Sequence, residues 1–434
     1  MIRPIGEVTK LIDRKIEVQP DVTYRQIGVR VWGKGSYERE LIKGSDTKYK
    51  RFSKVKKGDI IVNKIWARNG SVAVVPLELD GCHASTEFPL YEINTDELDP
   101  LWFEWITKQS FFWKKCEDKS GGTSGKNRIK PKAFLEIRIP IPDIETQKKL
   151  LKDITFTDDH IKTISQSMKI TYEQILELRQ VILQEAMQGK LVPQDPNDEP
   201  ASALLEKIKK EKEKLIKEKK IKKEKPMPPI PEEEMPYQLP KGWEWLRLGE
   251  LGETQTGTTP STKNSEFFNG DIPFIKPADI SDKGINYRNE SLTLEGLKHG
   301  RLISENSLMM VCIGGSTGKS FYTDRDCSCN QQINTIKGLQ NISAKFIYYF
   351  TTSQYFQAEV WKKSTGSATN IINKLKWASI LFPLPPLNEQ KRIVQKVDQL
   401  MKLCDELEEQ VKENQKNSEL LMEAVLREAF DSSH

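Results

Sequence analysis

The sequence predicts an α+β fold: two mixed α/β globular halves in a tandem repeat, separated by long antiparallel coiled-coil helices. The repeat is visible as one long interval, since Pro140 lies 243 positions before Pro383 and Gln147 lies 243 positions before Gln390. The coiled coil is visible along residues 393–425, where positions at alternating intervals of four and three form a continuous stripe. A chain of 434 residues is also too long for a single core.

The two copies match over most of their length. The interval of 243 positions also relates residues 181–187 to residues 424–430, and an interval of 244 relates residues 102–112 to residues 346–356. Each copy therefore consists of a globular part followed by a helical part. We divide the chain into a first globular domain (1–143), a central helical region with a Lys-rich helix and a Pro-rich linker (144–240), a second globular domain (241–386) and a distal coiled-coil helix (387–434).

The helical stripe recurs in both copies and predicts a helix pair. In the second copy it consists of Ile393, Val397, Leu400, Cys404, Leu407, Val411, Asn414, Ser418, Leu421 and Val425. In the first copy it consists of Leu150, Ile154, Thr157, Ile161, Ile164, Met168, Thr171, Ile175, Leu178 and Ile182. We expect the two stripes to meet as antiparallel helices, with the globular halves at opposite ends. The alternative is that each helix packs only on its own globular half.

The globular halves contain both strand and helix patterns. Apolar runs predict strands at 59–65, 71–77, 271–277 and 307–313, and aromatic residues at helical spacing predict helices at 100–116 and 343–361. Between the copies, residues 201–223 predict a solvated helix with Glu–Lys pairs, followed by a Pro-rich linker at 225–236. The lysines of this helix form either a solvated face or a contact with DNA phosphate or a partner subunit.

Composition limits the class of protein. The chain has 67 Lys and Arg residues against 62 Asp and Glu, so its net charge of +5 does not by itself indicate a nucleic-acid partner. There is no run of eighteen apolar residues and no apolar core of a signal peptide, so we expect a cytoplasmic protein without a membrane partner. Six cysteines in a chain of this length favour reduced thiols over disulfides or a zinc site.

No catalytic motif is complete. Residues 313–320 (IGGSTGKS) resemble a phosphate-binding loop but have Ile313 where that loop requires glycine. Asp143 and Glu145 resemble nuclease carboxylates, but their position at a proline-to-helix junction favours an acidic helix N-terminus. The sequence therefore predicts a chain that is not an enzyme, with no catalytic residue, no bound metal and no cofactor of its own.

Polar loops that contain glycine recur in both copies and are the candidate DNA-binding site. Gln, Asn, Lys, Arg and Thr side chains can hydrogen-bond to base edges or phosphates, and glycine lets the backbone approach DNA closely. Such loops are more often plain surface turns, but their recurrence favours binding. The candidate residues of the first copy are Lys34, Arg68, Asn69, Ser85, Thr86, Thr123, Ser124, Lys126 and Arg128. Those of the second copy are Thr258, Thr259, Ser261, Lys263, Ser316, Thr317, Lys319, Gln331, Gln332, Thr365, Ser367 and Asn370.

Several stretches together resemble a known family. The two-copy layout, PLPPLNEQKRIVQKVDQLMKLCDELE from Pro383, LPKGWEWLRLGEL from Leu239, TGTTPS from Thr256 and the Lys-rich helix are similar to the specificity (S) subunit of type I restriction-modification systems. The first copy departs from the family pattern, with IPDIETQKKLL where PLPPLNEQKRIV is typical.

The resemblance implies a function for the whole chain. Two target recognition domains would each read one half of a split double-stranded DNA sequence, and the helices would separate them and bind two methyltransferase (modification) subunits. ATP-dependent restriction/translocase subunits would complete the complex, with S-adenosylmethionine, ATP and magnesium on the partners. The chain would thus direct adenine methylation or restriction. The alternative is a non-catalytic two-domain scaffold without sequence-specific DNA binding, while a fused methyltransferase or nuclease is disfavoured because the N-P-P-[YF] and cofactor motifs are missing.

Overall fold

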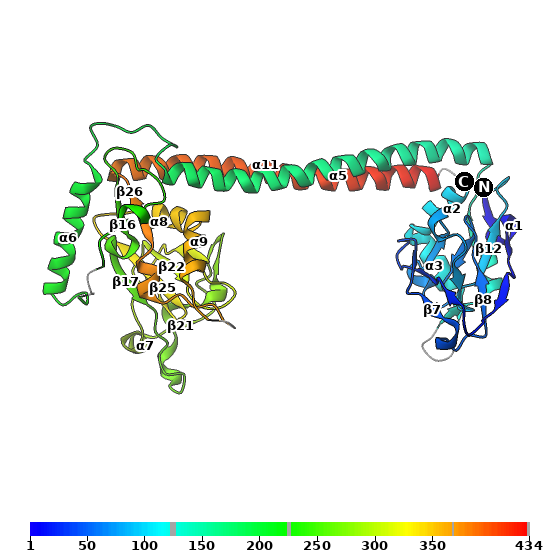
Figure 1. Cartoon of the computed structure of the whole chain (residues 1–434), viewed down its shortest axis with the longest axis horizontal. Coiled ribbons are helices and arrows are strands. Elements are labelled where there is room, and N and C mark those ends of the chain that lie inside the picture. Colours follow the sequence, from blue (N-terminus) through cyan, green and yellow to red (C-terminus); the bar gives the residue numbers. More distant parts are fainter. Residues whose placement is uncertain (122–126, 224–226, 367–368, 432–434) are drawn as a thin grey trace. The chain divides into compact units, whose positions relative to one another are not determined.

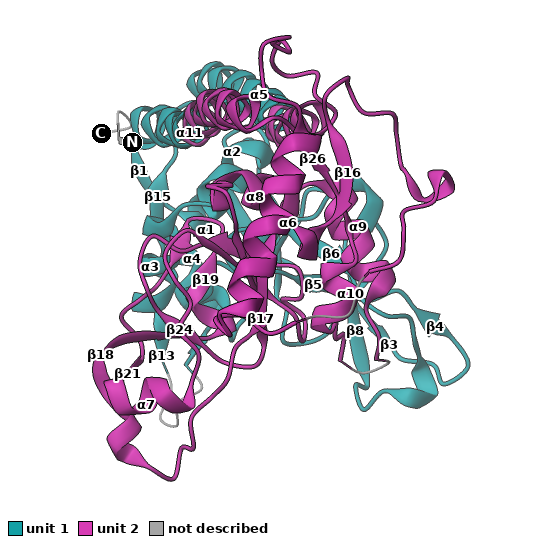
Figure 2. Cartoon of the chain, turned by 90° about the vertical axis from the view of Figure 1, so that its left-hand side faces the viewer, with its two compact units in different colours: residues 1–168, 413–434 teal, residues 169–412 magenta. Residues whose placement is uncertain are grey.

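The computed structural model describes residues 1–121, 127–223, 227–366 and 369–431. The chain divides into two compact units: unit 1 is residues 1–168 with 413–434, and unit 2 is residues 169–412 (Figure 2). Figure 1 draws two long helices, α5 (Ile144–Met187) and α11 (Leu387–Asp431). Each has one part in unit 1 and one part in unit 2 (Figure 2). Along the described residues, none of the helices combines the length and hydropathy required of a membrane-spanning segment.

The globular part of unit 1 is built from short strands and helices. Its strands are β1 (Ile2–Pro4), β2 (Thr9–Leu11), β3 (Lys15–Glu17), β4 (Thr23–Tyr24), β5 (Ile27–Val29), β6 (Ser36–Glu38), β7 (Ile42–Lys43), β8 (Arg51–Lys54), β9 (Ile60–Val62), β10 (Val72–Val74), β11 (His83–Ala84), β12 (Leu90–Ile93), β13 (Ser120–Gly121), β14 (Arg128–Ile129) and β15 (Arg138–Pro140). Its helices are α1 (Ile5–Val8), α2 (Pro100–Thr107), α3 (Ser110–Asp118) and α4 (Pro131–Leu135).

The globular part of unit 2 has a similar composition of elements. Its strands are β16 (Glu244–Arg247), β17 (Gly252–Thr256), β18 (Phe268–Ile275), β19 (Ile280–Ser281), β20 (Gly284–Ile285), β21 (Ser291–Leu292), β22 (Ser307–Val311), β23 (Ser320–Tyr322), β24 (Ser328–Cys329), β25 (Ile333–Gly338) and β26 (Leu381–Leu384). Its helices are α6 (Ala201–Lys217), α7 (Leu294–His299), α8 (Ala344–Thr351), α9 (Gln354–Lys363) and α10 (Lys374–Ala378).

The two units share one sheet topology, which confirms the predicted repeat. The antiparallel sheet of unit 1 has the order β10-β9-β12-β2, and that of unit 2 has the order β23-β22-β25-β17. In each unit a strand near the start of the copy also pairs with the strand before the long helix: β1 with β15, and β16 with β26. In each copy, therefore, the first and last strands of the globular part pair with each other.

The central strands β9 and β22 confirm the predicted apolar strands and are buried on both faces. Ile60 and Val62 belong to one core and Ile61 to another, because successive side chains of a strand point to opposite faces. In β22, Leu308 and Met309 are divided between two cores in the same way. Burial on both faces explains why these strands read as continuous apolar runs.

The two predicted aromatic helices are each divided into two. Residues 100–116 form α2 and α3, because Gln109 has an extended backbone (ψ 136°). Residues 343–361 form α8 and α9, since Ser353 is also extended and its hydroxyl accepts a hydrogen bond from the Phe356 N–H (3.3 Å). The turn lets the aromatic residues of both short helices reach one core, where Phe350 and Phe356 are fully buried.

Helices α5 and α11 pair in antiparallel fashion within each unit. In unit 1 the start of α5 shares a core with the end of α11, as Ile154 clusters with Val425. In unit 2 the end of α5 shares a core with the start of α11, as Ile182 clusters with Val397. The same two cores include the globular part of each unit, so the helices pack on each other and on the globular parts.

The predicted seam has two sets of positions, and it is correct for one set and correct in part for the other. The set that is buried or half-buried contains Ile154, Ile161, Met168, Ile175, Ile182, Val397, Cys404, Val411, Ser418 and Val425. In the other set Ile393 is fully buried and Leu150, Thr157 and Leu400 are half-buried, whereas Ile164, Leu178, Leu407 and Leu421 are 42–53% exposed.

At Leu178, Leu407 and Leu421 the half-buried position lies one residue further along the chain. In unit 2, Arg179 lies in the seam instead of Leu178, and its guanidinium is 2.6 Å from Asp405 and 3.3 Å from Glu408. Its Nη1 lies 3.9 Å from the sulfur of Met401. The aliphatic stem of arginine fills the seam while its charged end reaches carboxylates, so an ion pair replaces the expected apolar contact.

Helix α6 is not solvated all round, as the sequence had suggested. Ala201, Leu204 and Ile208 lie on one face and are buried in the main core of unit 2. The Lys212 ammonium donates hydrogen bonds to the carbonyls of Gly249 and Gly252, at 2.9 Å each. The helix is therefore docked on unit 2 by an apolar stripe and by one lysine, and only its remaining faces are exposed.

The junction before α5 is a helix cap, as predicted. The Asp143 carboxylate accepts hydrogen bonds from the Thr146 N–H (2.9 Å) and the Thr146 hydroxyl (2.7 Å). These bonds hold the pKa of Asp143 below its ordinary value. Glu145 lies in the first turn and pairs with Lys148 at 2.9 Å. Both carboxylates thus belong to the helix terminus.

Candidate nucleic-acid interface

In unit 2 the strand register brings the four predicted loops to one end of the sheet. Thr256, at the end of β17, pairs with Asn334 at the start of β25. Val311, at the end of β22, pairs with Ile333, so the turn into β23 emerges at the same end. The loops at 256–264, 314–319 and 329–334 therefore leave the sheet side by side. The described parts of the segment at 364–370 join them, because Ile371 pairs with Ile313.

Hydrogen bonds tie these loops to one another. The Thr258 N–H donates to the Cys329 carbonyl (2.9 Å), and the Thr259 hydroxyl donates to Gln331 Oε1 (2.6 Å). On the other side, the Gly314 N–H donates to the Asn370 carbonyl (2.8 Å). The four loops thus form one continuous surface whose parts hold each other in place.

Gly257 allows the loop after β17 to lie in close contact with the loop before β25. Its N–H donates to the Ile333 carbonyl at 3.0 Å. A Cβ atom at this position would clash with the carbonyl oxygens of Asn330 and Cys329. Glycine is therefore required for the loop after β17 to lie against the loop before β25.

The candidate side chains of unit 2 differ in their availability. Those of Ser261, Lys263, Ser316, Lys319, Gln331 and Thr365 are exposed, and those of Thr258, Thr259, Gln332 and Asn370 are half-buried. Thr317 is 4% exposed, and its hydroxyl donates to the Gly314 carbonyl at 2.7 Å, so it holds the turn together. The exposed set contains the donors and acceptors that a DNA groove would meet.

Unit 1 gathers its loops in the same way. The Trp32 N–H donates to the Asn69 carbonyl (2.6 Å), which joins the loop after β5 to the loop between β9 and β10. The Ile129 N–H donates to the Lys64 carbonyl (2.9 Å), which joins the segment around Arg128 to the same loop. Glu87 lies on the fourth loop, 3.7 Å from the Lys64 ammonium and 3.6 Å from the Arg128 guanidinium. These ion pairs link the fourth loop to the others.

The candidate residues of unit 1 lie on these joined loops. Lys34, Thr86 and Arg128 are exposed, and Arg68, Asn69 and Ser85 are half-buried. Next to them, burial lowers the pKa of His83, which favours the neutral ring at neutral pH. Four predicted residues, Thr123, Ser124, Lys126 and Ser367, lie outside the described residues.

Two exposed tryptophans in unit 1 were missed by the sequence analysis. Trp32 and Trp66 are each 48% exposed, and both lie on the joined loops. Trp32 has a left-handed backbone (φ 62°), which is unusual for a bulky residue, and its ring packs edge-on against Trp113 at 5.2 Å. The signal was available, because a tryptophan in the glycine-rich stretch WGKG is a poor candidate for a buried core position.

The four loops of unit 1 are expected to match the four loops of unit 2 in chain order, and the first of these correspondences is wrong. The loop at 32–40 connects β5 and β6, whereas the loop at 256–264 follows β17, whose counterpart in the sheet of unit 1 is β2. The other three correspondences agree with the strand order. Residues 12–59 of unit 1 and residues 257–306 of unit 2 connect corresponding sheet strands, but they form different short strands and helices, and Lys34 has no positional counterpart among the predicted residues.

The chemistry of both surfaces is that of binding. Within the described ranges, no three His, Cys, Asp or Glu side chains lie close enough to hold a metal ion. All six cysteines are buried and unbridged, and burial raises the pKa of the Cys327 thiol to about 12. Unit 1 presents hydroxyls, an amide, a lysine and arginines, and unit 2 presents hydroxyls, amides and lysines, on loops fixed by backbone hydrogen bonds. Such a set can recognise a polar, negatively charged ligand.

Comparison with known proteins identifies the same architecture elsewhere. Residues 1–172 and 240–416 match the family model described as type I restriction modification DNA specificity domain. The specificity subunit of the type I restriction enzyme EcoAI from Escherichia coli is 29% identical over 428 residues, which cover 86% of this chain and 72% of that protein. The HindI specificity subunit from Haemophilus influenzae is 26% identical, covering 88% of each chain.

Solved structures share the fold at lower identity. The HsdS subunit from Thermoanaerobacter tengcongensis aligns over 100% of this chain and 97% of its own length, with a TM-score of 0.65 and 18% identity. A chain from a structure of the type I R-M system aligns over 99% of this chain and 97% of its own, with a TM-score of 0.69 and 18% identity.

Proposed function

The chain belongs to the family of type I restriction-modification DNA specificity proteins, and we propose that it is the subunit that reads a two-part DNA target. One observation carries the proposal: each of two units gathers its own polar loops into one hydrogen-bonded surface. The topology of the two sheets is the same, but the residues on the loops differ. Two surfaces with different residues suit the recognition of two different half-sequences.

The proposed partners are duplex DNA, two methyltransferase subunits and restriction/translocase subunits, acting in the cytoplasm. Exposed apolar residues on the long helices support a protein partner there, since Leu178 and Leu407 are each 44% exposed. In this assembly S-adenosylmethionine, ATP and magnesium belong to the partners, and the chain supplies sequence choice for methylation or restriction.

The test is a comparison of the chain with and without its methyltransferase subunits. We expect the purified chain alone to bind no S-adenosylmethionine and to transfer no methyl group. The complex should methylate duplexes that carry the target and leave a duplex with a scrambled target unmethylated. Methyl transfer by the chain alone, or equal methylation of both duplexes by the complex, would refute the proposal.

A further inference from the structure

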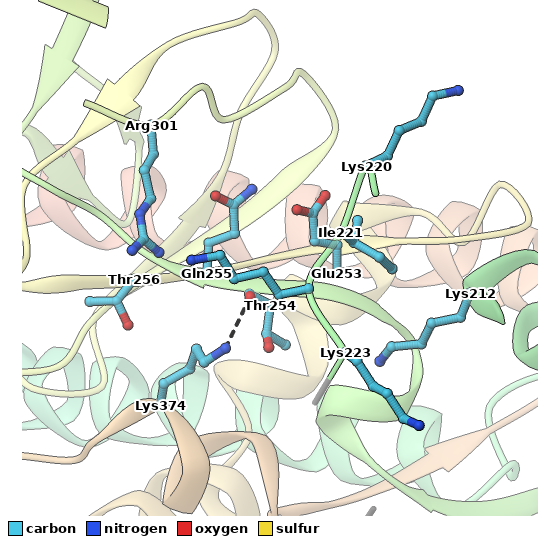
Figure 3. A pocket seen from close by; sticks show the side chains of 11 residues that line it. Lys212, Lys220, Ile221, Lys223, Glu253, Thr254, Gln255, Thr256, Arg301 and Lys374 are labelled. Carbon is cyan, nitrogen blue, oxygen red and sulfur yellow. Dashed lines mark hydrogen bonds between the residues drawn. The ribbon is translucent and has the colours of Figure 1, made fainter. Parts of the chain in front are cut away.

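A basic cleft lies beside the edge strand β17 in unit 2. It has a volume of about 620 Å³ and is lined by the strand, by residues at the end of and after α6, and by α10 (Figure 3). Its basic side chains are Lys212, Lys220, Lys222, Lys223, Arg301 and Lys374, and its acidic side chain is Glu253. The excess of positive charge makes the cleft suited to an anionic ligand.

Two of the lysines hold the walls of the cleft. Lys212 donates to the carbonyls of Gly249 and Gly252, which fixes α6 along β17. The Lys374 ammonium donates to the Thr254 carbonyl at 3.2 Å, which fixes the start of α10 on the opposite side (Figure 3). The concave shape is therefore built by specific hydrogen bonds, and the remaining basic side chains border it.

The remaining basic residues are less engaged with the protein. Lys220 lies 2.8 Å from Glu218, and its side chain is 67% exposed. Within the part of the chain that the structure describes, no ion pair joins Lys222, Lys223 or Arg301 to a carboxylate. Six basic side chains line the cleft with a single carboxylate, so like charges repel each other there, and a bound anion would relieve that repulsion.

The cleft is continuous with the candidate DNA-binding loops of the same unit. Thr256 lines the cleft, and its hydroxyl donates to Asn334 Oδ1 at 2.8 Å, next to the residues from which the loops begin. The Asn334 amide in turn reaches the Ile372 carbonyl at 3.4 Å, two positions before Lys374. A DNA strand that binds the loops would thus have the cleft as its neighbour.

We propose that this cleft binds phosphates of the DNA flanking the half-target read by unit 2, in a manner that is independent of base sequence. The inference rests on the proposed function. DNA carries a regular row of phosphates, and lysines that neutralise them add affinity without adding specificity. The cleft has the composition of such a site: several flexible lysines and one arginine, with no cluster of amides to read base edges.

The test removes three charges from the cleft and compares the result with the removal of three charges elsewhere on the same segment. The cleft variant is Lys220→Ala/Lys222→Ala/Lys223→Ala. The control variant is Lys209→Ala/Lys210→Ala/Lys214→Ala, which removes the same net charge from residues of α6 that do not line the cleft. Both variants are assembled with the methyltransferase subunits, and their DNA affinity is measured from about 50 to 200 mM salt.

The cleft variant should bind target and scrambled duplexes more weakly by a similar factor. Its salt dependence should fall by about 0.9 in log–log slope for each phosphate that the protein no longer neutralises, or roughly 2.7 for three, while the methylated sequence stays the same. The control should retain the parental slope. Arg301→Gln, made separately, should lower the slope by about 0.9.

The proposal is overturned by an unchanged slope, by an equal decrease in the control variant, by an altered methylated sequence, or by dissociation of the methyltransferase subunits with DNA affinity intact. The last outcome would assign the cleft to a protein partner. Failure of the proposed function gives a different result, because the parental complex would then show no preference for any target over a scrambled duplex.

Discussion

Replacement of Gln331 by alanine should relax one half of the DNA target and leave the other half unchanged. The side chain is exposed at the centre of the joined loops of unit 2, and its Oε1 accepts a hydrogen bond from the Thr259 hydroxyl at 2.6 Å. This bond orients the amide so that its N–H groups remain available for a base. A hydrogen bond to a base edge contributes about 1–3 kcal/mol of discrimination, which corresponds to roughly 5- to 150-fold in affinity.

The assay measures binding of the assembled complex to duplexes altered in one half-target at a time. Gln331→Ala should lose discrimination at one or two base pairs of a single half, and Thr259→Val should show a weaker form of the same defect. Lys298→Ala, an exposed substitution on α7 that belongs to none of the four loops, serves as the control. A uniform decrease in affinity for all duplexes, or changes in both halves, would refute a base-reading role for Gln331.

Three further predictions concern unit 1, the pH dependence of stability and the long helices. Trp32→Ala should weaken DNA binding by about 1 kcal/mol through the other half-target with little change in thermal stability, measured as for Gln331; an unchanged affinity would exclude binding by this side chain. Burial raises the pKa of Glu389 above its ordinary value of 4.5, so ionisation of this carboxyl opposes folding. The free energy of unfolding should therefore decline as the pH rises from the ordinary pKa through the higher pKa of the folded state. Glu389→Gln should abolish this decline in denaturant titrations, and an unchanged pH profile would contradict the assignment. Insertion of seven residues after Met168 and seven after Val411 should lengthen each helix by about 10 Å and the target spacer by roughly three base pairs, whereas an unchanged methylated spacer would mean that the distance is set elsewhere.

The repeat and the central strands could be predicted because local pattern determines them. A run such as Ile60 to Val62 can be accommodated only where both faces of a strand are covered. The division of the aromatic helices could not be predicted from periodicity, since the break at Ser353 depends on how two aromatic faces reach one core.

The seam shows why helix pairing was predicted only in part. Leu178 fits the apolar stripe, yet Arg179 occupies the inward position because Asp405 and Glu408 on α11 meet its charge. The sequence of one helix does not reveal the register of its partner. For α6, by contrast, the apolar residues Leu204 and Ile208 are spaced to lie on one helical face. Their burial could have been predicted from this spacing, although the many lysines around them suggested a solvated helix.

The sequence predicts the candidate DNA-binding surfaces as sets of loops, and the structure brings the described loops of each unit together. Recurrence in both copies identified the loops, and the sheet register then explains why they meet. Recurrence cannot distinguish a side chain that binds a ligand from one that stabilises its own turn. Thr317 is of the second kind, because its hydroxyl donates a hydrogen bond within the turn. Trp32 shows the opposite case, in which an apolar residue lies on a polar surface and escapes a search for polar side chains.

Independent reading of DNA by the two units can be tested in cells that express this chain with its methyltransferase subunits. The measurement is the sequence that becomes methylated. Genomic DNA from cells with the parental chain, with Gln331→Ala and with Trp32→Ala is mapped for methylated sites. We expect a two-part sequence with an unspecified spacer of fixed length for the parental chain, a change in one half for Gln331→Ala and a change in the other half for Trp32→Ala. A single uninterrupted sequence, or both halves changing together in either variant, would contradict independent reading by the two units.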